Sequence, residues 1–156
     1  MHLWRRRFQL QKYFLRFCGA TIGNENTFNG WVKFEFFPSN VVIGHKNFFS
    51  TGVIINCREG IRIGNENHFS SNVVITDQKL NLELKMHEVA NVAVGDNNWL
   101  STGVIVASSH EPIFIGNSVI VGAHSFVNKS LLNTKESNPE GKLFFGTPAR
   151  PQGRKS

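Results

Sequence analysis

Apolar residues recur every six positions along most of this chain, in five successive runs. Each run begins at an Ile or Val that is followed by Gly, with further apolar residues six and twelve positions later. The runs are Ile22-Phe28-Phe34, Ile43-Phe49-Ile55, Ile63-Phe69-Ile75, Val94-Leu100-Val106 and Ile115-Val121-Val127. This period fits neither an amphipathic helix nor a simple alternating strand, but it fits a triangular coil with three short flat sides. The pattern predicts an all-β parallel solenoid whose stacked coils bury columns of apolar residues.

The spacing between runs predicts where the solenoid is irregular. From the last apolar residue of one run to the first of the next, the steps are nine, eight, nineteen and nine residues. All the extra residues therefore emerge from one corner of the triangle. The longest insertion, residues 76–91, is too long for a tight turn, and loops of this size are usually functional or disordered. Residues 56–59 lie below it and residues 107–112 above it in the predicted stack, so we expect the chemistry at this corner.

Length and charge narrow the alternatives. A chain of 156 residues has the usual size of a single core. We expect a cap at 1–18, a β-helix at 19–130 with the loop 76–91 extruded from it, and a C-terminal segment at 131–156. Lys and Arg total 17 against 11 acidic residues, which favours anionic partners such as nucleotide phosphates, acidic glycans or lipid headgroups. Nucleic acid is not expected, because the basic residues are scattered or terminal and form no recognition module.

Residues 2–18 predict a short basic helix that Gly19 ends. Two roles stay open for it: a cap over the apolar end of the solenoid, or an interfacial helix that holds the protein near anionic lipid. The residues expected to share one face are Trp4, Phe8, Phe14 or Leu15, and Cys18.

The two cysteines, Cys18 and Cys57, predict neither a disulfide framework nor a metal site, which suits a reducing compartment. No apolar run approaches the roughly 20 residues of a membrane span, and the start of the chain lacks the apolar stretch of a secretory signal. We therefore expect a cytoplasmic protein, with peripheral contact at the inner face of the membrane as the alternative role of the N-terminal helix.

Three motifs resemble those of the hexapeptide-repeat acyltransferases. Residues 94–100 resemble the family's Ile-Gly-x-x-x-Trp-Ile, residues 121–129 resemble Ile-Gly-Ala-Gly-Ser-Val-Val-Thr-Lys, and residues 146–150 resemble its closing Gly-Asn-Pro-Ala-Lys/Arg. The resemblance covers residues 19–151. It implies a left-handed parallel β-helix, a homotrimer, and acetyl-CoA as the acetyl donor.

The same resemblance implies a donor groove between two subunits. It assigns the pantetheine arm to the small residues Thr102 and Ala123, and the phosphates of CoA to Asn128, Lys129 and Arg150. Phosphates favour fixed cations and amide donors, which agrees with these residue types. A solvated surface charge is the alternative for the two cations.

Acetyl transfer to a hydroxyl or amine needs a general base, and an imidazole is suited to this near neutral pH. The resemblance places that His directly after the strand that enters the long loop, where residues 76–79 contain none. Two candidates remain. His110 lies on a short bulge one coil above the expected position, and His87 lies at the end of the long loop.

The predicted acceptor site contains Asn56, one coil below the loop, together with Asp77 and Trp99. No metal centre is expected, although the γ-class carbonic anhydrases share this solenoid. Those enzymes bind zinc through three His, two of them five residues apart, and no two His have that spacing here. His45 and His68 are expected to be structural.

The sequence therefore predicts an acetyl-CoA-dependent O-acetyltransferase that acts on a surface polysaccharide, such as a capsule or lipopolysaccharide, or on its sugar precursor. N-acetylation of an amino-sugar nucleotide is one alternative. A catalytically silent solenoid that serves as an assembly scaffold is another, because the expected His is missing.

Overall fold

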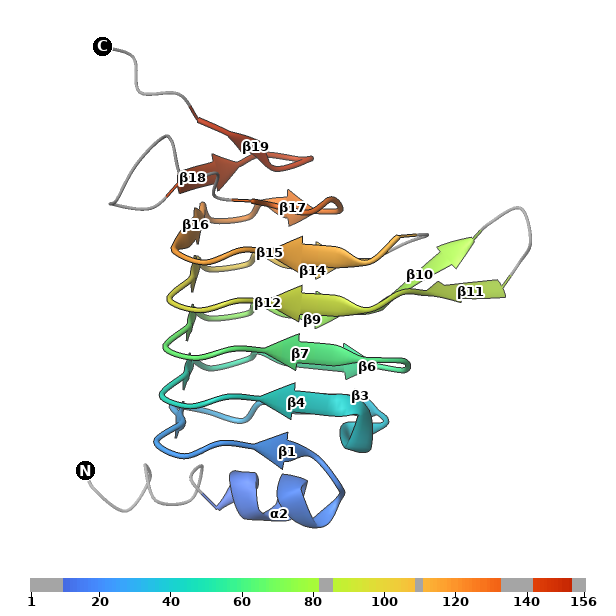
Figure 1. The fold of residues 1–156 in the computed structure, drawn as a ribbon, viewed down its shortest axis with the longest axis vertical. Helices are drawn as coiled ribbons and strands as arrows, with labels where there is room; N and C mark the ends of the chain where they lie inside the picture. Colours follow the sequence, from blue (N-terminus) through green and yellow to red (C-terminus); the bar gives the residue numbers. More distant parts are fainter. Residues whose placement is uncertain (1–9, 82–85, 109–110, 133–141, 153–156) are drawn as a thin grey trace.

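The computed structural model describes residues 10–81, 86–108, 111–132 and 142–152. Short strands wind into a parallel β-helix whose three sheets form the sides of a prism (Figure 1). Sheet A contains β1 (Thr21–Ile22), β4 (Val41–Ile43), β7 (Ile61–Ile63), β12 (Val92–Val94) and β15 (Ile113–Ile115). Sheet B contains β2 (Thr27–Phe28), β5 (Phe48–Phe49), β8 (His68–Phe69), β13 (Trp99–Leu100), β16 (Val119–Val121), β18 (Lys142–Phe145) and β19 (Arg150–Pro151). Sheet C contains β3 (Lys33–Phe36), β6 (Ile54–Cys57), β9 (Val74–Thr76), β14 (Ile105–Ala107) and β17 (Phe126–Val127).

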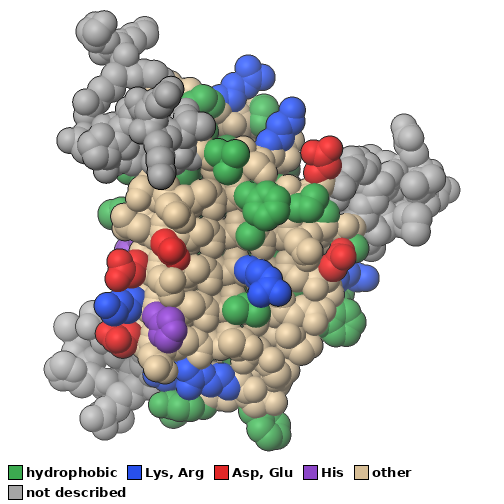
Figure 2. All heavy atoms as spheres, in the orientation of Figure 1, with side chains coloured by type: hydrophobic (Ala, Val, Ile, Leu, Met, Phe, Trp, Pro, Cys, Tyr) green, Lys and Arg blue, Asp and Glu red, His purple; other side chains and the backbone are tan. Residues whose placement is uncertain are grey.

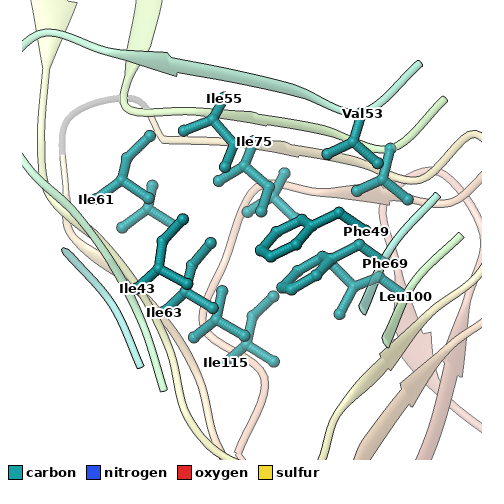
Figure 3. Packing of buried hydrophobic residues seen from close by; sticks show 14 of the residues in the cluster. Ile43, Phe49, Val53, Ile55, Ile61, Ile63, Phe69, Ile75, Leu100 and Ile115 are labelled. Carbon is teal, nitrogen blue, oxygen red and sulfur yellow. The ribbon is translucent and has the colours of Figure 1, made fainter. Parts of the chain in front are cut away.

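The predicted apolar columns form the core (Figure 3). Fourteen of the fifteen residues in the five runs are buried, and Phe34 in the first coil is partly buried against the same cluster. The rings of Phe28 and Phe49 stack at 5.1 Å between centroids, and those of Phe49 and Phe69 at 4.9 Å. Each coil buries its inward residues against the coils on either side. The six-residue repeat of the sequence therefore directly specifies the packing of the core.

The corner that joins sheet A to sheet B, called the ladder corner here, comprises residues 23–26, 44–47, 64–67, 95–98 and 116–118. Its last residue is a buried Asn in four coils, namely Asn26, Asn47, Asn67 and Asn98. In the middle of this ladder, Asn67 Nδ2 donates to the Gly95 carbonyl at 2.8 Å, and its Oδ1 accepts the N–H of Asn98 at 2.9 Å. A Cβ at Gly64 would lie 2.7 Å from the Gly95 carbonyl oxygen, so the close approach of the coils requires glycine there.

The corner that joins sheet C to sheet A, called the loop corner here, comprises residues 37–40, 58–60, 77–91 and 108–112. Its first crossing contains η1 (Pro38–Asn40). Its longest crossing is an antiparallel hairpin of β10 (Gln78–Asn81) and β11 (Met86–Val89), which projects away from the prism (Figure 1). This confirms the predicted extruded loop.

Two elements close the ends of the solenoid. Below the first coil, α2 (Gln11–Phe17) buries Gln11 and Leu15. Of the residues predicted to share a helix face, Leu15 is buried, Phe14 and Cys18 are exposed, and Trp4 and Phe8 lie outside the described residues.

At the other end, β18 pairs with β16 and places the buried Phe144 opposite Val121, while Leu131 bridges to Ile115. The columns therefore continue past residue 130, which the five runs do not anticipate. The division into 1–18, 19–130 and 131–156 stays a prediction.

Candidate functional site

The carboxylate of Asp77 is the centre of the loop corner. Its side chain is fully buried, and its oxygens accept the backbone N–H groups of Arg58 at 2.9 Å, Glu59 at 2.6 Å and Gly60 at 2.9 Å. The Asp77 carbonyl accepts the N–H of Ala90 at 3.0 Å, which closes the base of the β10–β11 hairpin. Asp77 therefore joins the hairpin to the coil below. Substrate binding by Asp77 stays a prediction, and the carboxylate would have to leave these amides to make it.

The thiol of Cys57 lies beside this carboxylate, with Sγ 3.6 Å from Asp77 Oδ2. Burial, and then the negative charge of Asp77, raise the pKa of the Cys57 thiol to about 12. A thiol in this state is not a nucleophile, because the thiolate is the reactive form.

A line of polar side chains crosses the outer surface of sheet C next to the loop corner. Gln78 Nε2 donates to Asn56 Oδ1, and Asn56 Nδ2 donates to Glu35 Oε2 at 2.9 Å. Glu35 also pairs with Lys33 at 2.5 Å. The structure thus gives the predicted acceptor residue Asn56 two side-chain partners that sequence reasoning did not assign to the site. The signal for Glu35 is its outward position in β3, directly beside Asn56 in the next coil.

Two polar atoms at the loop corner are buried and lack a hydrogen-bond partner within the described part of the chain, namely Gln78 Oε1 and Arg58 Nε. The Arg58 guanidinium carbon lies 4.2 Å from the centroid of the Phe36 ring. Buried polar groups are normally hydrogen bonded. These two atoms therefore mark the corner as a place where a further polar partner would be stabilising.

The predicted stacking above the loop corner is confirmed. Ala107 pairs with Thr76, and the Ser108 N–H donates to the Thr76 carbonyl at 3.1 Å. The buried Ser108 hydroxyl donates to the Glu111 carbonyl at 3.0 Å, which closes the bulge above the hairpin.

Both candidate bases come from these two segments. His110 lies outside the described residues. The backbone of His87 pairs with Leu80 in the hairpin, and its side chain also lies outside the described part of the structure. Which imidazole faces the loop corner stays a prediction.

The residues predicted to bind the acetyl donor, acetyl-CoA, lie at the two corners that flank sheet C. Thr102 and Ala123 are exposed at the corner between sheets B and C, where the Thr102 carbonyl accepts the N–H of His124 at 2.9 Å. Arg150 pairs with Phe145 in the β18–β19 hairpin that closes over this corner. Asn128 and Lys129 are exposed and directly follow β17, so they lie on the other side of sheet C, where the chain leaves it.

Trp99 lies on a third surface, the outside of sheet B. Its ring is 4.6 Å from the ring of His68, which stacks on Phe48 at 4.6 Å, and its indole N–H donates to Ser70 Oγ at 3.3 Å. Burial lowers the pKa of His68. Within one chain, the structure therefore does not bring Trp99 together with Asn56 and Asp77. His45 has a structural contact, since its Nδ1 accepts the N–H of Asn24 at 3.0 Å.

Within the described residues, no three His, Cys, Asp or Glu side chains are grouped so that they could hold a metal ion. Among the same residues, no helix is long and apolar enough to cross a membrane.

No protein-family model matches the chain. No curated protein matches it either. Solved structures do match its fold. The chain superposes on a hexapeptide-repeat containing acetyltransferase from Vibrio cholerae O1 biovar eltor, solved with acetyl coenzyme A. The TM-score is 0.75 at 19% identity, over 92% of this chain and 75% of that one.

Two further structures are similar over most of their length. A maltose O-acetyltransferase from Clostridium difficile 630 has a TM-score of 0.58 at 20% identity, over 97% of this chain and 88% of that one. A mutant of an N-acyltransferase from Bacillus cereus, solved with dTDP and coenzyme A, has a TM-score of 0.60 at 14% identity, over 92% and 88%. These likenesses show the fold. The chain is an all-β, left-handed parallel β-helix of the hexapeptide-repeat type, with a short N-terminal helix and a loop extruded at one corner, as the sequence predicted.

Proposed function

We propose that this protein is an acetyl-CoA-dependent acyltransferase that O-acetylates a sugar of a surface polysaccharide, or a precursor of that polysaccharide. The observation that carries the proposal is the loop corner. This chain shares its fold with a maltose O-acetyltransferase and with an acetyltransferase solved with acetyl coenzyme A. Its own long hairpin lies at this corner. Beside it lies the polar line Glu35-Asn56-Gln78, which offers carboxylate and amide groups to the hydroxyls of a sugar.

The donor residues have a chemistry that suits CoA. Ala123 and Thr102 have small, exposed side chains, so an extended arm can approach the backbone at this corner. Lys129, which follows β17, and Arg150, in β19, are exposed cations and would bind phosphate groups. When bound, acetyl-CoA supplies an activated acetyl thioester. This chain would hold the acceptor at Asn56 and remove the proton from its attacking oxygen, with His110 or His87 as the base.

We propose that the working unit is a homotrimer with the site between subunits. A strand of three residues in sheet C is only about 10 Å long. Even so, the predicted site residues of one chain lie on three separate surfaces: the two corners that flank sheet C and the outside of sheet B. A neighbouring copy that packs against the side of the prism would bring Trp99 or the Thr102 edge of one chain toward the loop corner of another.

The test is release of CoA from acetyl-CoA in the presence of capsular and lipopolysaccharide sugars, with amino-sugar nucleotides in the same panel. We expect acceptor-dependent release by the wild-type protein. One of the variants His110→Ala and His87→Ala should lower it by about 100-fold or more. His45→Ala is the matched control, since that imidazole has a structural partner.

The panel also decides between the remaining alternatives. Release that depends only on amino sugars would favour the N-acetyltransferase, which the likeness to the Bacillus cereus N-acyltransferase makes a specific candidate. An absence of release with every acceptor, together with an absence of acetyl-CoA binding in calorimetry, would contradict the enzyme proposal and favour the scaffold.

A further inference from the structure

The helix that closes the first coil is apolar on the side that faces away from the protein. Its inward contacts are made by Gln11 and Leu15. The outward residues Leu10, Tyr13, Phe14 and Phe17 follow the i, i+3, i+4, i+7 spacing of one helix face. Their exposed fractions are 64%, 58%, 66% and 90%. We call these four residues the end face. Capping the solenoid does not account for it, because the two residues that cap are on the other side.

Exposed aromatic residues of the first coil lie near both ends of the helix. Gln11 hydrogen bonds the backbone N–H and carbonyl of Val32, so the neighbouring Trp31, which is 66% exposed, lies beside the first turn of α2. Gly19, two residues after the end of the helix, lies against Ser39, which is close in sequence to the exposed Phe37. The exposed aromatic residues Trp31 and Phe37 are therefore close in sequence to the two points where the helix segment meets the first coil. Figure 2 shows hydrophobic side chains at this end of the molecule with Lys and Arg side chains next to them.

Charge indicates what the end face contacts. Residues 1–18 contain five Lys and Arg residues and no Asp or Glu, so most of the net charge of +6 belongs to this segment. Within the described residues, Lys12 lies over the Tyr13 ring, and Arg16 donates to the carbonyls of Ile22 and Gly23 at the edge of the first coil. Cations that border an exposed aromatic face are typical of segments that lie in the headgroup region of an anionic membrane.

We infer that the end face binds the surface of a membrane that contains anionic lipid, with Tyr13, Phe14 and Phe17 in the interface and Lys12 among the headgroups. This inference goes beyond the proposed function and does not require it. A second copy of the chain is the other candidate occupant. It is less well matched, because two basic end faces would repel each other. Association into a trimer along the sides of the prism leaves the ends free.

This orientation has a consequence for the loop corner. With α2 on the membrane, the solenoid stands upright, and each coil adds about 4.8 Å of height. The β10–β11 hairpin follows the third coil. The corner with Asn56 and Gln78 then lies about 5–10 Å above the first coil, which is within reach of a sugar attached to a lipid.

The test is sedimentation of the full-length protein with vesicles, without acetyl-CoA or acceptor. We expect binding to vesicles of phosphatidylcholine and phosphatidylglycerol in equal parts, weaker binding in high salt, and little binding to phosphatidylcholine alone. Phe14→Ser combined with Phe17→Ser should weaken binding by about tenfold or more. Lys12→Glu is a second variant that tests the charge without removing apolar contacts.

Phe114→Ser is the matched control, because Phe114 is 52% exposed on sheet A, far from α2. It should bind vesicles like the wild type. The inference is overturned if the wild-type protein does not bind anionic vesicles, or if the Phe14 and Phe17 substitutions leave binding unchanged. It is also overturned if, in ultracentrifugation without lipid, these substitutions dissociate an assembly while vesicle binding is absent, since that result would assign the end face to a second copy.

Discussion

The ladder corner repeats one asparagine in four consecutive coils, whereas the loop corner changes its length along the solenoid. At the ladder corner the Oδ1 atoms of Asn26, Asn47 and Asn67 each accept the backbone N–H of the Asn in the next coil, so the same contact is repeated from coil to coil. At the loop corner a single carboxylate, that of Asp77, binds three amides of the crossing below it. A repeated contact distributes stability over the stack. A single contact concentrates it at one residue, and leaves the neighbouring chain free to vary in length and to carry function.

Replacing Asp77 with Ala should have the largest effect on stability. The substitution leaves the buried N–H groups of Arg58, Glu59 and Gly60 without an acceptor, and we expect a loss of about 3 kcal/mol in the free energy of unfolding. Denaturant unfolding followed by circular dichroism measures it. Asp77→Asn is the control, because it keeps one acceptor oxygen and should lose less. Equal losses in the two variants would contradict the role given to the carboxylate.

Within the ladder corner, position should matter. Asn67→Ala removes two hydrogen bonds donated by Nδ2 and one accepted by Oδ1, and we expect a loss of about 2 kcal/mol. Asn98 is the last Asn of the ladder, and its Nδ2 has no partner in the described structure, while its Oδ1 accepts the N–H of Val119. Asn98→Ala should therefore lose only about 1 kcal/mol. The same denaturant experiment compares them, and the reverse order would show that the ladder does not act through these bonds.

The hairpin should be dispensable for the fold. Replacing residues 79–88 with an Asn-Gly turn joins Gln78 to Val89, which already pair. We expect the free energy of unfolding to change by less than about 1 kcal/mol, because shortening a closed loop has a small entropic effect. Under the proposed function, acetyl transfer should be lost if His87 is the base and impaired if the hairpin only shapes the site. Cooperative unfolding at much lower denaturant would show instead that the hairpin stabilises the coil.

The smallest effect concerns the two thiols. Because burial and Asp77 raise the pKa of Cys57 to about 12, this thiol should resist a thiol reagent in the folded protein, while the exposed Cys18 reacts. Cys18→Ser should abolish labelling of the native protein, and denaturant should restore reaction at Cys57. Rapid labelling of Cys57 in folded Cys18→Ser would mean that the loop corner opens.

The raised pKa of the Cys57 thiol also predicts how the stability of the protein depends on pH. A raised pKa contributes stability that is fully present below the ordinary value of 9.0 and is lost as the pH rises toward about 12. Stability measured over this range should fall less in Cys57→Ala than in the wild-type protein.

The sequence predicted the fold because its signal is repeated. An Ile, Phe or Val at a given place in one coil packs on its counterparts in the adjacent coils, so five weak patterns support one another. The extruded loop followed from counting residues between runs. The runs align Glu35 with Asn56 in adjacent coils, but a period does not say which outward side chains form hydrogen bonds. The line from Glu35 through Asn56 to Gln78 therefore came only from the structure. The structure also separates the residues predicted to bind the acceptor, since Trp99 lies on sheet B and Asp77 lies inside the loop corner.

The sequence by itself determined the coil, the inward residues and the corner that varies, since all three are properties of a period along one chain. Only the tertiary structure decided which polar groups become partners and which face of the N-terminal helix is left outside. Phe14 and Leu15 are adjacent and both apolar, yet one is exposed and the other is part of the core. The physical reason is that hydrogen bonds and packing at the ends of a solenoid are made between coils. Such contacts depend on the stacking register and on the angle at which the helix meets the first coil. The spacing of apolar residues along the sequence determines neither of them.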